Sequence, residues 1–305
     1  MKFFKFLTFA FFIVFLLPSC TEEIDITLRP GDVRLVVEGG IGIDTTSHRV
    51  VLSRTTSFFE EPEVPLYVEG ATVTITEFDE NMQETGRIFR LTETRPGHYY
   101  TDDTVFGIQR HTYRLTIVLN ENIGGHTTYT ADAFFPPIAD RIDSIQAFWG
   151  TNMLWMLFGV NPDVTGRTGW NVRLWATDPP GQNFYIFVTS KNGVALNDTL
   201  TRFLMLDNTM IAQPEIGLTG VSIAFIPDDS PNAVSPGDTL GLEIRGISAE
   251  YYRWISEFRD IYSGQNPMFG GAPANIRGNI SGGAIGFFWA HGNRRAYVVA
   301  GQSEQ

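Results

Sequence analysis

Most of the chain reads as short β-strands separated by turns. From about residue 33 onward, apolar and polar residues alternate in runs that end in Gly, Pro, Asn or Asp, and alternation with a period of two is typical of a strand with one buried face. In 71–77, Val73 and Ile75 fall on one face and threonines on the other. The strands expected in the first half are 34–38, 49–53, 71–77, 87–93, 98–100, 113–119 and 127–133. Turns recur about every 8–12 residues, which is typical of a β-sandwich.

Two consecutive prolines, Pro136 and Pro137, divide this pattern. Neither residue has a backbone N–H to donate to a sheet, so a sheet should end there. Further strands are expected at 144–149, 184–190, 201–206, 220–226, 239–246 and 287–289. We therefore predict a mainly β protein with two β-sandwich domains, 33–137 and 138–305.

One segment in the second half, 248–262, has a helical pattern instead. Its apolar residues recur at helical spacing and form one stripe: Tyr251, Ile255, Phe258 and Tyr262. Ser248 is suited to cap the N-terminus and Gly264 to end the helix. We expect this amphipathic helix to pack against the second sandwich, and the alternative is a helix that binds a partner.

The first 19 residues have the pattern of an export signal. Lys2 and Lys5 precede an apolar run, 6–17, which is shorter than the roughly 20 residues that a membrane-spanning helix needs. The run ends in Leu17-Pro18-Ser19-Cys20, which resembles the lipobox of bacterial lipoproteins. The thiol of Cys20 would take a diacylglyceryl group, and several acyl chains on one residue give stable membrane anchoring. The alternative is an ordinary signal peptide followed by an incidental cysteine.

The cysteine count and the net charge exclude several classes of protein. Of the 305 residues only one is Cys, so this chain alone cannot form a disulfide framework, a Cys-rich zinc site or an iron–sulfur cluster. Loss of 1–19 would remove Lys2 and Lys5 and change the formal net charge from −12 to −14, which argues against a nucleic-acid partner. Residues 20–32 would then form a lipidated tether.

An acidic pair, Glu22 and Glu23, follows Cys20 closely. It resembles the surface-export signal of lipoproteins in some Gram-negative bacteria, and the alternative is a simple solvated tether. Together with the lipobox, this pair predicts a protein that is lipid-anchored in the outer membrane and exposed at the cell surface.

Common motifs for catalysis and metal binding are absent from the sequence. The five histidines are far apart along the chain, and neither H-E-x-x-H nor G-x-S-x-G occurs. We therefore expect no catalytic residue, no metal and no cofactor, and hence a protein that is not an enzyme. The alternative is a hydrolase whose carboxylates come from distant parts of the sequence.

Four of the six tryptophans lie close together in the sequence: Trp149, Trp155, Trp170 and Trp175. Aromatic faces on an extracellular β-domain can stack on sugars or other flat ligands, so these residues are our candidates for ligand binding. They are equally the ordinary filling of a sandwich core, because each buries a large area. The alternating contexts of Trp155 and Trp175 favour the core.

Several short segments occur in the order and spacing of a known family. They are Val36-Val37-Glu38-Gly39, Val51-Leu52-Ser53-Arg54, Gly70-Ala71-Thr72-Val73-Thr74-Ile75, Leu91-Thr92-Glu93-Thr94, Pro96-Gly97-His98-Tyr99, Tyr113-Arg114-Leu115-Thr116-Ile117, Pro136-Pro137, Asp143-Ser144-Ile145, Ser248-Ala249-Glu250-Tyr251-Tyr252 and Gly264-Gln265-Asn266-Pro267. On these segments the mature chain resembles the bacterial lipoprotein family called domain of unknown function 4249. Some of the segments also occur in Ig-like and carboxypeptidase-regulatory-like domains, so we expect sandwiches of these types.

The resemblance implies a surface lipoprotein of the outer membrane, often encoded beside a TonB-dependent transporter, and it implies no catalytic residues. Our first hypothesis is therefore a non-enzymatic accessory lipoprotein that captures a ligand for such a transporter or caps it. The second hypothesis is a structural or adhesive surface protein whose Ig-like domains bind polymers of a host or a neighbouring cell. The third is the hydrolase with scattered carboxylates.

The lipid anchor leads to a direct prediction. A Cys20→Ala variant lacks the only thiol that could be acylated, so it should leave the membrane fraction and lose labelling by radioactive palmitate. Ser19→Ala, which keeps a small residue before the cysteine, is the matched control and should stay labelled. Membrane-bound, palmitate-labelled Cys20→Ala protein would contradict the lipobox assignment.

Overall fold

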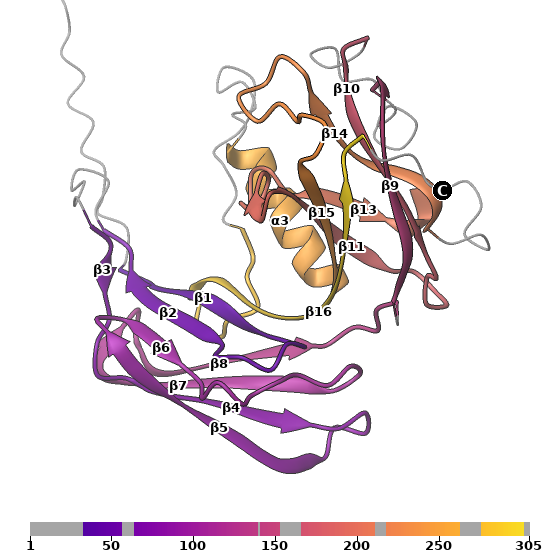
Figure 1. Cartoon of the computed structure of the whole chain (residues 1–305). Coiled ribbons are helices and arrows are strands. Elements are labelled where there is room, and N and C mark those ends of the chain that lie inside the picture. The colour runs from indigo at the N-terminus through magenta and orange to yellow at the C-terminus, as the bar shows by residue number, and fades with distance from the viewer. Residues whose placement is uncertain are drawn as a thin grey trace, which may run out of the picture. The chain divides into compact units, whose positions relative to one another are not determined.

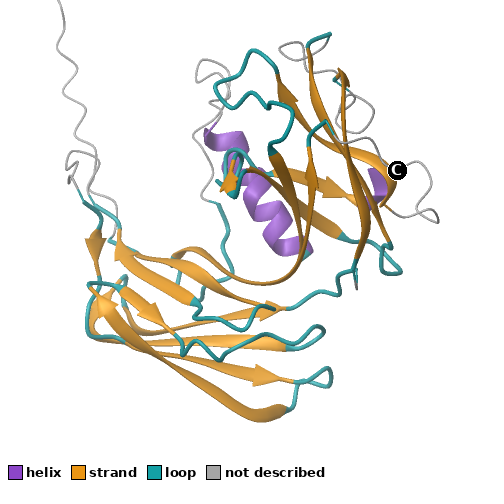
Figure 2. Cartoon of the chain, in the orientation of Figure 1, coloured by secondary structure: helices purple, strands orange, loops and turns teal. Residues whose placement is uncertain are grey.

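The computed structural model describes residues 33–56, 64–139, 141–152, 166–210, 218–262 and 276–301. In these ranges the chain is mainly β, with one α-helix near its C-terminal end (Figures 1 and 2). The elements are β1 (Leu35–Gly42), β2 (Arg49–Arg54), β3 (Leu66–Tyr67), β4 (Thr72–Phe78), β5 (Glu84–Arg95), β6 (His98–Tyr100), β7 (Thr112–Ile123), β8 (His126–Phe134), β9 (Ile142–Thr151), β10 (Thr168–Ala176), β11 (Phe184–Lys191), β12 (Val194–Ala195), β13 (Leu204–Asp207), the 3-10 turn η1 (Asn208–Met210), β14 (Leu218–Pro227), β15 (Thr239–Ile247), α3 (Ala249–Tyr262) and β16 (Ile285–Val299). The predicted mainly β, sandwich-like fold with a helix near 248–262 is confirmed.

The N-terminal strands enclose one hydrophobic core. β1, β2 and β6 are neighbours in one sheet, and β4, β7 and β8 are neighbours in the other. The long strand β5 pairs with both β6 and β4 and so joins the two sheets. In β1, β4 and β7 alternate residues are buried, as the period-two pattern predicts. Fully buried members of this core include Leu35, Val37, Ile75, Tyr113, Leu115 and Phe135.

The strands from β9 onward form two further sheets. The sheet β14-β10-β9, which we call sheet C, packs on the sheet β12-β11-β15-β16, which we call sheet D. Their shared core contains Val172 and Leu174 of β10 and Leu242 of β15. Helix α3 packs on the other face of sheet D, where Ile255 lies in a second core with Ile186.

Strand β11 shows why both faces of sheet D have to be buried. Its residues 185–189 are all buried, so it has no solvent-facing side there. Tyr185 and Phe187 belong to the core shared with sheet C, whereas Ile186 and Val188 belong to the core beneath α3. A continuous apolar run is typical of a strand that is covered on both sides.

Helix α3 begins as its sequence predicts. The backbone N–H of Tyr251 donates to the Ser248 hydroxyl at 3.2 Å, which makes Ser248 the N-cap. The aromatic rings of Tyr251 and Trp254 stack with centroids 5.9 Å apart, and Tyr251 also stacks on Trp289 of β16 at 5.5 Å. The apolar stripe therefore contacts sheet D, as expected for a helix that packs against a sandwich.

Strand β16 connects the two groups of strands. Its first part pairs in parallel with β1, from Val36↔Ile285 to Gly42↔His291. Its second part pairs antiparallel with β15, from Gly246↔Gly292 to Thr239↔Val299. Figure 1 shows the strand running from β1 to β15. Contacts group Asp32–Gln305 into one compact unit, and the domain boundary near residue 137 stays a prediction.

The sequence pattern misses a few strands and shortens others. It does not assign β10, in which Gly169, Asn171 and Arg173 alternate with apolar residues. Such residues are poor strand formers, but here neighbouring strands pair with β10 on both sides. β16 extends well beyond the expected 287–289 because its polar second half gains a partner in β15.

The pairing of β1 with β16 requires a glycine at position 40, and a substitution there tests this requirement. A Cβ at Gly40 would collide with the indole ring and the backbone carbonyl of Trp289. Gly40→Ala should therefore lower the free energy of unfolding by about 1–3 kcal/mol, measured by urea denaturation. Gly150→Ala in β9 is the matched control, because the nearest atoms would lie 4.0 Å from its Cβ and it should change stability little. Equal effects of the two substitutions would contradict this packing.

Candidate functional site

The predicted site residues fall partly outside the described ranges. Cys20, Glu22, Glu23 and Trp155 all lie there, so their roles stay predictions. Within the described residues no helix is both long and apolar enough to cross a membrane. In the same part of the chain, no three His, Cys, Asp or Glu side chains are grouped as ligands of a metal ion.

Two of the candidate tryptophans are direct neighbours. Trp149 of β9 and Trp170 of β10 are paired across sheet C, and their rings meet edge to face with centroids 5.9 Å apart. Trp170 is 7% exposed and donates from Nε1 to the carbonyl of Val234 at 3.1 Å, so it is a core residue with its polar atom satisfied. Trp149 is 51% exposed at the edge of this core.

Trp175 lies on the opposite face of sheet C. It is paired with Ser144 of β9, whereas Trp170 is paired with Trp149, and the odd separation of the two tryptophans on β10 places their side chains on different faces. Its half-buried ring lies next to Gly220. The three candidate tryptophans that the structure describes therefore do not form one continuous platform.

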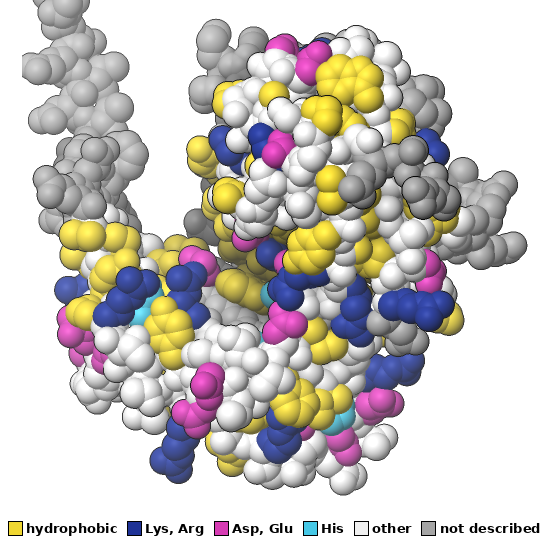
Figure 3. Space-filling model, in the orientation of Figure 1, with side chains coloured by type: hydrophobic (Ala, Val, Ile, Leu, Met, Phe, Trp, Pro, Cys, Tyr) yellow, Lys and Arg dark blue, Asp and Glu magenta, His cyan; other side chains and the backbone are white. Residues whose placement is uncertain are grey.

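A network of charged side chains lies instead on the helix-side face of sheet D. Glu243 of β15 accepts hydrogen bonds from Arg245 at 2.6 Å and from Arg295 of β16 at 2.8 Å. Arg245 also donates to Asp198 at 2.9 Å, and Arg295 donates to Asp44 at 3.0 Å. Each of the five charged groups thus has an opposite charge beside it. Figure 3 shows such neighbouring basic and acidic side chains across one face of the molecule.

The pKa of Glu243 shows which effect dominates in this network. Burial would raise the pKa of its carboxyl, but the attraction of Arg245 and the hydrogen bonds from Arg245 and Arg295 outweigh burial and lower it. Burial likewise opposes the charge on Arg245, whereas Glu243 and Asp198 raise its pKa. The network is therefore held in its ionised form.

A small pocket of about 190 Å³ opens beside these charges. Its lining includes Val188 and Ser190 of β11, Glu243 and Arg245 of β15, and Tyr297 of β16. Ion pairs fix the positions of the arginines and the glutamate, so the polar wall of the pocket is preorganised. The pocket can offer hydrogen-bond donors, a carboxylate and an aromatic ring to a small ligand.

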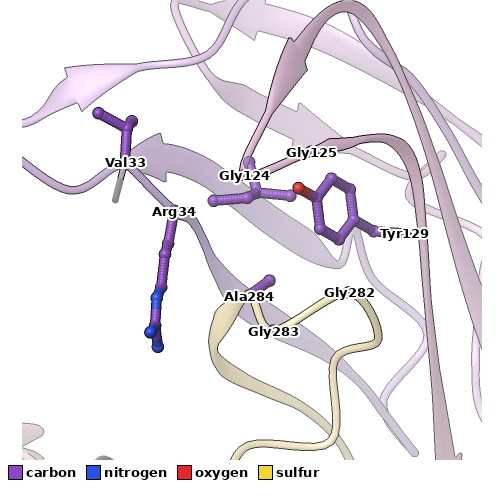
Figure 4. A pocket seen from close by; sticks show the side chains of 9 residues that line it. Val33, Arg34, Gly124, Gly125, Tyr129, Gly282, Gly283 and Ala284 are labelled. Atoms are coloured by element: carbon purple, nitrogen blue, oxygen red, sulfur yellow. The ribbon is translucent and has the colours of Figure 1, made fainter. Parts of the chain in front are cut away.

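A larger cavity of about 610 Å³ lies at one end of the N-terminal sandwich, where the described chain begins (Figure 4). Its wall is formed by the start of β1, the β7–β8 turn and the turn before β16. Gly282 and Gly283 in the latter turn have φ of 66° and 71°, a conformation that favours glycine. The Tyr129 hydroxyl donates to the carbonyl of Ile123, and Arg34 supplies the cavity's only charged lining side chain among the described residues.

A buried carboxyl group lies inside the N-terminal sandwich. Glu77 of β4 is 1% exposed and accepts hydrogen bonds from Arg87 at 2.6 Å, Tyr113 at 2.8 Å and Thr85 at 3.0 Å. The Tyr113 hydroxyl also accepts from the backbone N–H of Ile108, and burial raises the pKa of this tyrosine. Because Glu77 is fully engaged, we assign it a structural role in joining β4, β5 and β7.

The polar clusters around Glu77 and Glu243 were not predicted from the sequence, although the alternation of residues along each strand gives a signal for both. Period-two alternation puts Glu77 on the same inward face as Val73 and Ile75, which marks it as a buried carboxyl. In β15, Gly241, Glu243 and Arg245 likewise share one face. Their partners Arg295 and Asp198 are about fifty residues away in the sequence, so nothing local predicts the pairing.

The fold and these clusters define a mainly β protein with preorganised polar pockets, and comparison with known proteins gives its family. The sequence matches the family model described as "Domain of unknown function (DUF4249)" over residues 21–296. The chain therefore belongs to this family, which confirms the resemblance noted in the sequence. No curated protein matches it.

One solved structure to which the chain is similar is a distant match. It is titled "Cytokine receptor complex - Crystal form 1A" and aligns with 72% of this chain and 86% of its own chain, at 9% identity and a TM-score of 0.23. At this TM-score and identity, the match supports no conclusion about the fold or the function of this chain.

A histidine beside the charged network gives a pH-dependent prediction. Burial, and then the positive charge of Arg245, lower the pKa of His291 to about 4, and its Nδ1 has no hydrogen-bond partner among the described residues. Because the unfolded chain binds this proton near pH 6.5, stability should be full above that pH and fall by on the order of 3 kcal/mol toward pH 4.

NMR titration of the His291 ring should locate its midpoint near pH 4. Urea denaturation of His291→Gln, which cannot take up this proton, should show a smaller loss of stability between about pH 6.5 and 4 than the wild type. A His291 midpoint at or above the ordinary value would contradict the buried, neutral imidazole.

Proposed function

We propose that the protein is a lipid-anchored, surface-exposed protein of the outer membrane that captures a ligand for a TonB-dependent transporter, without being an enzyme. The observation that carries this proposal is Cys20, the only cysteine in the chain, directly after a predicted export signal. A thiol at that position can be acylated and so serve as the site of lipid attachment. The acyl chains would then confine the protein to a membrane.

Two pockets in the described residues support the capture of a ligand. Sheet D carries a pocket with fixed polar groups, and the N-terminal sandwich carries a larger cavity. Pockets with a few positioned polar groups are the usual form of small-molecule sites. Anchoring at Cys20 would hold these pockets within reach of a transporter in the same membrane, which raises the effective concentration of captured ligand.

Co-purification tests the partnership. Tagged protein, isolated from detergent-solubilised outer membranes, should bring down a TonB-dependent transporter. The Cys20→Ala variant should bring down at least tenfold less, because the two proteins then no longer share a membrane. Absence of any transporter from the wild-type eluate would contradict the partnership. Normal uptake with lost attachment in a deletion strain would favour the adhesive alternative.

A further inference from the structure

The helix-side face of sheet D is only partly covered. Helix α3 packs over Ile186 and Val188 of β11 and over Ile247 of β15. Beyond Val188 the sheet continues with the directly paired residues Ser190, Gly241 and Tyr297, and of these Ser190 and Tyr297 line the small pocket. The pocket is therefore the part of this face that the helix leaves open.

Tyr297 provides a flat platform at this pocket. It is paired with Gly241, and a Cβ at Gly241 would lie 2.9 Å from two carbons of the tyrosine ring. The ring therefore lies over the glycine, across the sheet surface, and this position leaves no room for a larger residue. Because Tyr297 is 62% exposed, its other face is open to a ligand.

Hydrogen-bonding atoms surround this platform at fixed positions. Arg245 uses Nε and Nη1, and Arg295 uses Nε and Nη2, in bonds to neighbouring carboxylates. Each guanidinium therefore retains N–H groups that bond to no other described residue. Asp198 likewise keeps one carboxylate oxygen that accepts no hydrogen bond from another described residue. Ser190 contributes a hydroxyl group to the lining.

The charge balance decides the class of ligand. Three carboxylates and two guanidinium groups lie in one paired network, so an anion would face the carboxylates and a cation would face the arginines. A charged ligand would be attracted by one set of these groups and repelled by the other set beside it, so its charge would contribute little to binding. A neutral molecule with several hydroxyl groups can instead accept from the arginines, donate to Asp198 and leave every pair intact.

We propose that this pocket binds one ring of a neutral saccharide, stacked on Tyr297 and hydrogen-bonded by Arg245, Arg295 and Asp198. The volume of about 190 Å³ is below the roughly 300–1,000 Å³ of sites for drug-sized ligands, so it suits a single ring and not a buried chain. This inference rests on the ligand-capture part of the proposed function and names its ligand class.

Isothermal titration of the full mature protein in detergent tests the proposal. The probes are glucose, galactose, mannose and xylose with their disaccharides, and glucuronic acid and glucosamine serve as charged comparators. We expect at least one neutral sugar to bind. Tyr297→Ala should weaken that binding at least tenfold, whereas Tyr297→Phe, which keeps the ring, should stay within threefold of the wild type.

Two matched variants separate this pocket from other candidates. Trp149→Ala removes an exposed aromatic ring on sheet C and should leave binding unchanged. Gly241→Ala should weaken binding like Tyr297→Ala, because the new methyl group displaces both the tyrosine ring and Ser190. If a variant loses stability, hydrogen exchange of the wild type decides instead: the sugar should protect 188–198, 240–245 and 293–299.

Each contrary result has a clear meaning. No binding of any neutral sugar, binding of the charged comparators alone, or equal effects of Tyr297→Ala and Trp149→Ala would overturn the saccharide site. Protection elsewhere in the chain would overturn it too. Failure of the transporter to co-purify, with saccharide binding intact, would contradict the proposed partnership alone.

Discussion

The pairing of β16 with two different strands is the constraint on which the rest of the structure depends. Its first half continues the sheet of β1, and its second half is the neighbour of β15. Phe288 and Ala290 from the first half complete the N-terminal core, whereas Ala296 and Val298 pack against the core between sheets C and D. Residues near the end of the chain are therefore needed for the sandwich at its beginning.

The same strand positions the candidate ligand site. Arg295 and Tyr297 lie on the helix-side face of β16, in register with Glu243 and Gly241 of β15. A shift of one residue in this register would turn both side chains toward the core. Asn293 and Arg295 also contact Asp44, which lies between β1 and β2, so the ion-pair network links the site to the N-terminal sandwich.

The sequence predicted the elements with strong local signals and missed what depends on distant partners. The alternation in 71–77 and the capped, amphipathic segment 248–262 each encode their own structure, so β4 and α3 appear almost as expected. β10 was missed because it combines apolar residues with glycine, asparagine and arginine, and pairing on both sides stabilises it. The parallel pairing of β1 with β16 joins residues about 250 apart, which no local pattern encodes.

For the candidate site, the sequence offered stacking on the tryptophans as one interpretation and favoured packing in a core. Trp170 does fill a core, whereas Trp175 lies half-buried on the other side of the same sheet. The exposed ring next to fixed polar groups is Tyr297, which is identified only by its neighbours Gly241 and Ser190. Cys20, by contrast, is proposed as the lipidation site from the sequence alone, because the residues next to it carry the whole signal.

Residue-resolved hydrogen exchange under increasing urea tests the central role of β16 most directly. If one strand completes both groups of sheets, the slowest amides of β7 and of β11 should exchange through the same global opening, with equal free energies and equal dependence on urea. Exchange of either group at a clearly lower free energy, while the other stays protected, would show that the two halves unfold independently and would contradict this account.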